Sequence, residues 1–144
     1  MSKPDVEQPN LNAVESPVAR ARAKKTILFV DDDKDWRELV TTVLRDSGYE
    51  VRTARDATEA MVQTEGVQLS LMILDLDLGG ESGLMLLSFL QRNQPGVPII
   101  LFTGLNHDDE QIQGMLKQGA HQYVRKGPLE DLSKAVEVAL AQGA

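Results

Sequence analysis

Residues 27–33 have the sequence ILFVDDD, and residues 71–75 have the sequence LMILD. Both are short, continuous apolar runs that end in carboxylates, and a third such run ends in Thr103. Runs of this kind are typical of strands that are buried on both faces of a parallel sheet. The polar residue that closes each strand then lies at the carboxyl edge of the sheet, where open α/β proteins place their active sites.

Composition limits the kind of protein this is. The chain has 144 residues, of which 42% are hydrophobic, and this suits one folded domain of ordinary size. It contains no cysteine, which excludes disulfides, thiolate metal sites and a cysteine nucleophile. No apolar stretch approaches the length of a membrane-spanning helix, and the amino terminus lacks the apolar core of a signal peptide. We therefore expect a cytoplasmic protein with no membrane partner.

Residues 1–25 differ from the rest of the chain. They include three prolines, and their five basic and three acidic residues make a net charge of +2, whereas the whole chain carries −7. We predict a flexible extension over residues 1–25 and one domain over residues 26–144. The basic cluster at residues 20–25 is either a solubilising lead-in to the first strand or a binding arm. The acidic body argues against nucleic acid as a partner.

From Thr26 onward, strand and helix patterns alternate five times. Apolar stripes predict helices over residues 34–47 and 82–93, and a last helix with Leu129, Leu132, Val136 and Leu140 on one face. Two weaker helical patterns lie between the other strands. Gly114 weakens the second of these by about 1 kcal/mol relative to alanine.

The strand sequences also predict the order of the sheet. Residues 49–54 and 121–126 mix charged with apolar residues, as edge strands do, whereas the other three strands are nearly all apolar. With right-handed crossovers, this pattern predicts an α/β fold: a flavodoxin-like (βα)5 doubly wound parallel sheet with strand order 2-1-3-4-5. Strands one and three are then neighbours, and Asp31, Asp32 and Asp75 converge.

Three converging carboxylates repel one another unless a cation lies between them. Oxygen ligands without histidine or cysteine favour Mg²⁺, which takes one or two carboxylates and keeps water for a phosphate to displace. These residues predict a metal-dependent phosphoryl site. One carboxylate is then a candidate nucleophile, and Thr103 and Lys126 are placed to receive the phosphoryl oxygens.

Four motifs, in order, carry a family resemblance: Val30-Asp31-Asp32, Leu74-Asp75 with Gly83 eight residues later, Phe102-Thr103-Gly104, and Tyr123-Val124-Arg125-Lys126. From about Thr26 to Gln142 the chain resembles a response-regulator receiver domain of two-component signalling. The resemblance implies that Asp75 is the phosphoacceptor and that Thr103 and Lys126 bind the phosphoryl group. It also implies that Tyr123 is the aromatic partner in switching.

The resemblance further implies a Mg²⁺ cofactor and its ligands. Asp32 would bind the ion directly and Asp31 through water, while Asp75 and the backbone carbonyl of Asp77 would complete the protein ligands. The phosphoryl donor would be a sensor histidine kinase or a histidine phosphotransfer protein. The domain would then be a switch rather than an enzyme, since it would catalyse only its own phosphorylation and dephosphorylation.

The expected output is a change in the face formed by helix four, strand five and helix five. This face would serve docking to an unnamed target, phosphorelay, or phosphorylation-dependent homodimerisation. Because one helix follows Gly127, we expect a stand-alone receiver. The sequence also departs from the family pattern: Leu78-Gly79 replaces Met-Pro, Gly127 separates Lys126 from Pro128, and Leu105 offers no polar group.

Simpler interpretations of single residues stay open. Asp31 to Asp33 form a possible helix cap, of which Asp33 is the expected capping residue. Thr103 alone suits a strand end and Lys126 alone a solvated surface. Gly83 suits either a turn or a phosphate contact, while Gly104 is expected to keep the pocket accessible. Trp36 suits core packing or a role at the site, and His107 and His121 lack partner ligands for a metal.

Two alternative functions also stay open. Asp75-Leu76-Asp77 resembles the nucleophile and acid/base pair of haloacid dehalogenase-type phosphatases, although those enzymes place that motif before their other acids. A pseudo-receiver that binds partners without phosphate would keep the same fold. Incorporation of a phosphoryl group distinguishes a receiver from a pseudo-receiver, and multiple turnover of a phosphate ester would indicate the phosphatase.

Overall fold

A five-stranded parallel sheet forms the centre of the computed structural model, which describes residues 25–78, 81–104 and 109–142. The strand order is β2-β1-β3-β6-β7, so the predicted order is confirmed. The apolar runs form the three central strands, and the two mixed sequences form the edges. The strands are β1 (Thr26–Val30), β2 (Glu50–Ala54), β3 (Leu71–Leu74), β6 (Ile99–Thr103) and β7 (Gln122–Arg125).

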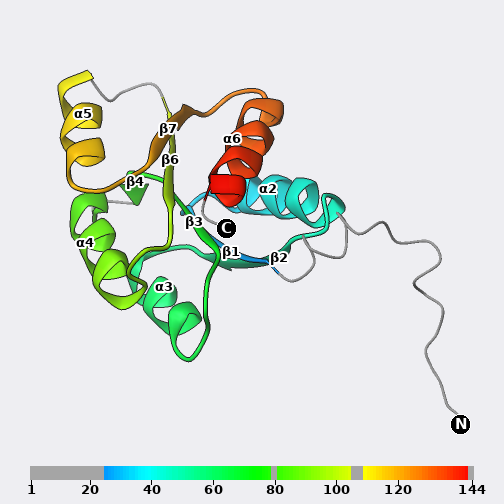
Figure 1. Ribbon diagram of the computed structural model, residues 1–144, viewed down its shortest axis with the longest axis horizontal. Coiled ribbons are helices and arrows are strands. Elements are labelled where there is room, and N and C mark those ends of the chain that lie inside the picture. The colour runs from blue at the N-terminus through cyan, green and yellow to red at the C-terminus, as the bar shows by residue number, and fades with distance from the viewer. Residues whose placement is uncertain (1–24, 79–80, 105–108, 143–144) are drawn as a thin grey trace, which may run out of the picture.

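Helices cover both faces of this sheet (Figure 1). α2 and α6 pack on one face, and α3 and α4 pack on the other, together with Met115 of α5. None of the helices in the described ranges is both long and apolar enough to cross a membrane. The helices are α2 (Lys34–Asp46), α3 (Ala57–Thr64), α4 (Gly83–Asn93), α5 (Asp109–Lys117) and α6 (Leu129–Gln142).

The apolar runs are continuous because successive side chains of a strand point to opposite faces and both faces are covered. In β1, Ile27 and Phe29 join the core beneath α2 and α6, while Leu28 and Val30 join the core beneath α3 and α4. All four side chains are fully buried. The apolar side chains of this strand therefore belong to the core, and the first acidic residue, Asp31, directly follows them.

Local signals set the ends of α2. The Asp33 carboxylate accepts hydrogen bonds from the backbone N–H groups of Asp35 and Trp36, so the predicted cap is present. Gly48, beyond the other end, has a φ of 97°, which glycine adopts without steric cost. The apolar stripe that predicts the helix over residues 34–47 also includes Leu39, but this side chain is 51% exposed. The buried stripe runs through Val40 and Leu44, and Leu39 lies beside it.

The sequence patterns did not predict a small two-stranded sheet between β3 and α4. It pairs β4 (Asp77–Leu78) with β5 (Glu81–Ser82) in antiparallel fashion. Two-residue strands are too short to show an alternating pattern. The Gly79–Gly80 dipeptide between them was the available signal, because Gly-Gly pairs are typical of tight hairpin connections.

Candidate functional site

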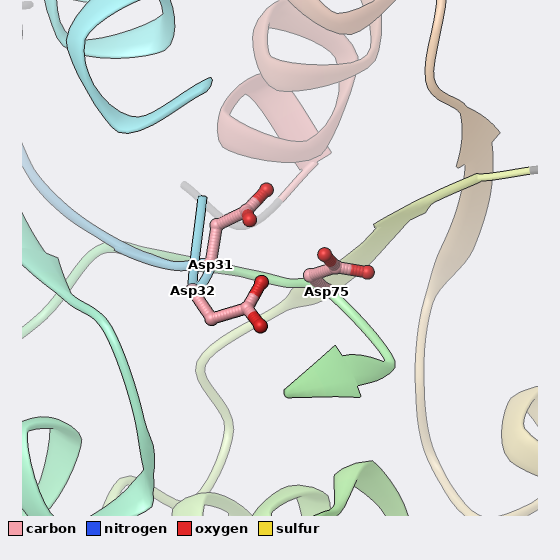
Figure 2. A group of neighbouring side chains, drawn as sticks. All are labelled: Asp31, Asp32 and Asp75. Atoms are coloured by element: carbon pink, nitrogen blue, oxygen red, sulfur yellow. The ribbon is translucent and has the colours of Figure 1, made fainter. Parts of the chain in front are cut away.

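Three carboxylates meet at the carboxyl edge of the sheet (Figure 2). Val30 and Leu74 are paired in the ladder between β1 and β3, so Asp31 and Asp75, which follow them, are neighbours. The adjacent Asp32 completes the group, and each residue offers an oxygen within 4.8 Å of the others. Asp31 and Asp75 are buried, whereas Asp32 is exposed. The group is therefore built into the core on one side and open to solvent on the other.

The Asp75 carboxylate accepts hydrogen bonds at both of its oxygens. Its Oδ1 accepts from the Thr103 hydroxyl at 2.8 Å and from the Asp77 backbone N–H at 3.1 Å. Its Oδ2 accepts from Lys126 Nζ at 2.8 Å. Three donors from three segments thus surround one carboxylate, which is the arrangement that binds negative charge on oxygen.

Lys126 also pairs with Asp31, whose Oδ2 lies 2.7 Å from Nζ. The lysine side chain is 13% exposed, and its backbone N–H donates to the Thr103 carbonyl at 2.8 Å. Burial lowers the pKa of Lys126, but its contacts with Asp31 and Asp75 outweigh burial and leave the pKa above its usual value. The ammonium is therefore a permanent positive charge between the two buried carboxylates.

Asp31 has a perturbed carboxyl group. Burial raises the pKa of Asp31 to about 6, because its charged form loses hydration, although Lys126 and the Asp33 backbone N–H partly offset this. The N–H of Asp33 donates to Asp31 Oδ1 at 2.9 Å. Asp31 Oδ2 lies 2.7 Å from the lysine ammonium and accepts no further hydrogen bond from the described residues. Oxygen donors, one of them buried and incompletely paired, suit a hard divalent cation.

The other predicted metal and switch residues lie near this group. Asp77 belongs to β4, and its side chain is exposed, while its backbone carbonyl stays a predicted ligand. Tyr123 pairs with Leu101 in the ladder, and Arg125 pairs with Thr103, so Tyr123 and Thr103 lie on one face of the sheet. Tyr123 is half-buried against the core on that face. The side chains of the two predicted switch residues are thus on the same side.

Gly83 had two open interpretations and Gly104 one predicted role. A Cβ atom at Gly83 would lie 3.1 Å from the Cα and 3.2 Å from the carbonyl oxygen of Leu76, so the close packing of α4 on the segment after Asp75 favours glycine. A Cβ at Gly104 would have no atom within 4 Å among the described residues, so its predicted role in access stays a prediction. The described residues contain no cis peptide bond, and Lys126–Gly127 is accordingly trans.

Two side chains of the first helical turn of α2 extend the site beyond the predicted set. Trp36 packs on the core, and Lys126 Nζ lies 5.2 Å from the centre of its ring. Arg37 Nη1 donates a hydrogen bond to the Asp31 carbonyl at 2.8 Å. Sequence spacing placed Trp36 on the core-facing stripe, one turn beyond Asp32. Nothing in the sequence pointed to Arg37, because its contact depends on the path of the loop before the helix.

The histidines belong elsewhere. His121 Nδ1 accepts a hydrogen bond from the Ile99 backbone N–H at 3.2 Å, at the far end of the sheet from Asp75. Among the described residues, the carboxylate group consists of Asp31, Asp32 and Asp75 and does not include His121. His107 and Leu105 lie outside the described residues, as does most of the predicted extension.

Comparisons with known proteins agree with this geometry. The family model described as the response regulator receiver domain matches residues 27–137. The nitrogen assimilation regulatory protein NtrX of Azorhizobium caulinodans is 36% identical over 102 residues, which cover 69% of this chain and 22% of that protein. The chain spans less than half of the length of the curated relatives it matches.

Solved structures show the same fold. A CheY-like response regulator receiver domain protein from Methanospirillum hungatei superposes with a TM-score of 0.77 at 30% identity, over 83% of this chain and 95% of that chain. A response regulator protein from Burkholderia pseudomallei superposes with a TM-score of 0.72 at 29% identity, over 81% and 66% of the two chains. Its structure has a phosphorylated aspartic acid, a calcium ion and citrate. The family model matches most of the length of this chain, and the solved structures share its fold. The chain therefore belongs to the response regulator receiver domains, the signalling domains of two-component systems.

Proposed function

We propose that this domain is a phosphorylation-dependent switch that accepts a phosphoryl group on Asp75. The observation that carries the proposal is the convergence of Thr103, Lys126 and the Asp77 backbone N–H on the Asp75 carboxylate. Hydrogen bonds that involve a charged group contribute about 1.5–3 kcal/mol each. Donors that now bind the carboxylate are placed to bind the oxygens of a phosphoryl group attached to it.

The proposed reaction is a displacement at phosphorus. A carboxylate oxygen of Asp75 forms a bond to phosphorus while the phosphorus–nitrogen bond of a phosphohistidine breaks, and the electron pair of that bond stays on the imidazole. Both Asp75 oxygens already have donors, so the incoming group must displace at least one donor from its carboxylate. Lys126 and Thr103 then move their contacts to phosphoryl oxygens, where negative charge has increased.

The acidic side chains suit Mg²⁺, which we propose is held by Asp31, Asp32, Asp75 and the backbone carbonyl of Asp77. When bound, the ion neutralises the charge that accumulates on the carboxylates and on the phosphoryl oxygens. The fit rests on an oxygen-only donor set and on the incompletely paired Oδ2 of Asp31. Asp32 lies on the exposed side, where a hydrated ion and a phosphodonor have access.

The proposed output is a change of surface at α5, β7 and α6. Thr103 ends β6 beside β7, and Tyr123 lies on the same face of the sheet. If the Thr103 hydroxyl turns toward a phosphoryl oxygen, Tyr123 gains room to move inward. The proposed partners are a sensor histidine kinase or a histidine phosphotransfer protein as donor, and a protein target or a second copy of the chain as receiver of the signal.

The structure solved for the Burkholderia pseudomallei response regulator supports this proposal by analogy, since it carries a phosphorylated aspartic acid and a calcium ion. The family assignment favours a signalling domain over the phosphatase alternative. A pseudo-receiver would share the fold, so uptake of a phosphoryl group is the decisive property.

The test is labelling at Asp75. Wild-type protein with Mg²⁺ and acetyl phosphate, or with a phosphorylated histidine kinase, should gain one phosphoryl mass by intact-mass spectrometry, and chelation of the metal should prevent the gain. Asp75→Asn removes the nucleophile but keeps the side-chain shape, so we expect no label. Asp46→Asn, the same change at an exposed residue at the other end of α2, should label as wild type does.

Two results would contradict the proposal in different ways. Full labelling of Asp75→Asn would place the phosphoacceptor at another residue. Absence of label on folded wild-type protein with every donor tried would favour a pseudo-receiver.

A further inference from the structure

Within residues 25–78, 81–104 and 109–142, Lys126 has a contact with Trp36 that depends neither on a carboxylate side chain nor on the backbone of β6. Lys126 Nζ lies 5.2 Å from the centre of the Trp36 ring, within the range of an attractive cation–π interaction. Tryptophan is the most favourable aromatic residue for this interaction. The ammonium is thus bounded by Asp31, Asp75 and an indole face.

The indole is itself held in place from two sides. It meets the Phe102 ring edge-on, with ring centres 5.4 Å apart and planes at 86°, and Phe102 is fully buried beside Thr103 in β6. The backbone N–H of Trp36 donates a hydrogen bond to the capping carboxylate of Asp33 at 3.3 Å. Trp36 therefore sits on a fixed helical turn and against a fixed strand, so it is a rigid surface for a flexible lysine side chain.

Phosphorylation would change both ion pairs that this ammonium makes with the described residues. Lys126 now pairs with Asp75 Oδ2 at 2.8 Å and with Asp31 Oδ2 at 2.7 Å. A phosphoryl group on Asp75 removes the charge of that carboxylate, and a cation bound by Asp31 competes with the lysine. The contact with Trp36 involves no group that changes charge. It is therefore a contact that stays the same before and after transfer, while the contact of Lys126 with the Asp75 carboxylate passes to phosphoryl oxygens.

We propose that Trp36 is a positioning residue for the phosphoryl transfer, and that its ring face keeps the Lys126 ammonium directed at Asp75. The inference rests on the proposed phosphorylation of Asp75. Trp36 touches neither the phosphoryl group nor the nucleophile, and it acts through Lys126. A role in core packing alone predicts that any apolar side chain of similar size would serve equally well.

Two substitutions separate these roles. Trp36→Phe keeps an aromatic face, and Trp36→Leu gives a smaller apolar side chain without one. We expect Trp36→Leu to slow labelling of Asp75 by acetyl phosphate at saturating Mg²⁺ by roughly 3- to 10-fold, and Trp36→Phe to slow it less. Because neither change removes a proposed metal ligand, Mg²⁺ affinity by calorimetry should stay within about twofold of wild type.

Val40→Ala is the matched control for loosening of the core. Val40 is fully buried, lies one turn further along α2, and belongs to the same core cluster against which Trp36 packs. This variant should lose thermal stability yet label at the wild-type rate. Rates are compared at a temperature where all four proteins are folded by circular dichroism.

A second measurement needs no phosphorylation. In the metal-free wild-type protein, the indole ring should shift the ε-methylene protons of Lys126 upfield in the NMR spectrum. We expect Trp36→Leu to abolish the shift, Trp36→Phe to keep part of it, and Val40→Ala to leave it unchanged.

Several results would overturn the inference. The aromatic face does not position Lys126 if Trp36→Leu labels at the wild-type rate. The same conclusion follows if Trp36→Phe labels as slowly as Trp36→Leu, or if Val40→Ala labels as slowly as both. An unshifted Lys126 resonance in wild type would also contradict it. If wild type takes up no phosphoryl group while the NMR shift is present, the proposed function fails, and the lysine contact is established independently.

Discussion

Asp31 is the residue at which the needs of the fold and the needs of the site conflict. It is fully buried at the end of β1, and burial of an ionised carboxyl group costs free energy unless its partners compensate. Lys126 and the Asp33 N–H compensate only in part, since the pKa of Asp31 is raised to about 6. A bound cation would remove the remaining cost, so the apo protein should be less stable than the metal-bound protein at neutral pH.

This conflict predicts a pH dependence in the metal-free protein. The native pKa of Asp31 exceeds its unfolded value of about 3.9, so Asp31 contributes most stability below pH 4 and loses that contribution as the pH rises through 6. The loss amounts to about 3 kcal/mol for a pKa difference of this size. Asp31→Asn lacks the titration. The difference in unfolding free energy, wild type minus variant, should therefore fall between pH 4 and 6 and level off above it.

Urea unfolding of both proteins in chelator, at intervals from pH 4 to 7, measures this difference. Parallel curves would show that the carboxyl group of Asp31 is not perturbed in the native protein. With saturating Mg²⁺ the wild-type decline should vanish, because a cation favours the ionised form.

At the scale of single elements, glycine has opposite consequences in α4 and α5. Gly83 begins α4 in contact with the backbone of Leu76, which directly follows Asp75. Gly114 lies inside α5, and a Cβ there would meet no described atom within 4 Å. Glycine is thus favoured by packing at the first position and only weakens the helix at the second.

We predict opposite effects of alanine at the two positions. Gly83→Ala forces a Cβ against backbone atoms that cannot move aside as a side chain would, and should destabilise the protein by about 1–3 kcal/mol. Gly114→Ala should stabilise it by up to about 1 kcal/mol, because alanine favours helix and restricts the unfolded chain. Urea unfolding of the pair checks this, and a stabilising Gly83→Ala would show that α4 does not need its close approach to Leu76.

At the scale of the whole molecule, the site connects four segments that are distant in sequence. Each segment supplies one residue at the carboxyl end of one of the neighbouring strands β1, β3, β6 and β7. These residues are Asp31, Asp75, Thr103 and Lys126, and hydrogen bonds and ion pairs connect their side chains. By contrast, α5 buries two side chains, Ile112 and Met115, and Leu116 packs partly buried against the core. We therefore expect a chemical change at Asp75 to alter the contacts of Thr103 and Lys126, and through them the position of α5, which few buried side chains hold.

We predict that Thr103→Ala accepts a phosphoryl group at Asp75 but transmits little of the response. Loss of the hydroxyl removes one charge-assisted hydrogen bond of about 1.5–3 kcal/mol, similar to the 1–3 kcal/mol that typically couples two sites. Hydrogen exchange should show much smaller changes over α5 and β7 on phosphorylation than in wild type. Thr103→Ser keeps the hydroxyl and should respond as wild type does. Equal exchange changes in Thr103→Ala and wild type would show that Thr103 does not carry the switch.

The sequence alone determined the features that depend on local pattern. Continuous apolar runs predicted the three central strands, mixed sequences predicted the two edges, and chain order with right-handed crossovers then led to the observed sheet. Asp33 was predictable as a cap because capping involves residues only two or three positions apart. The grouping of Asp31, Asp32 and Asp75 followed because polar residues that end adjacent parallel strands share one edge.

Only the tertiary structure decided features that depend on residues far apart in the chain. The reason for glycine at position 83 is the backbone of Leu76, and the exposure of Leu39 depends on how α2 rotates against the sheet. The hairpin of β4 and β5 is too short to leave a periodic signal. The contact of Trp36 with Lys126 joins residues 90 positions apart in the chain. An apolar stripe on a helix indicates that Trp36 packs against the core, but it does not indicate which charged side chain lies over the indole ring.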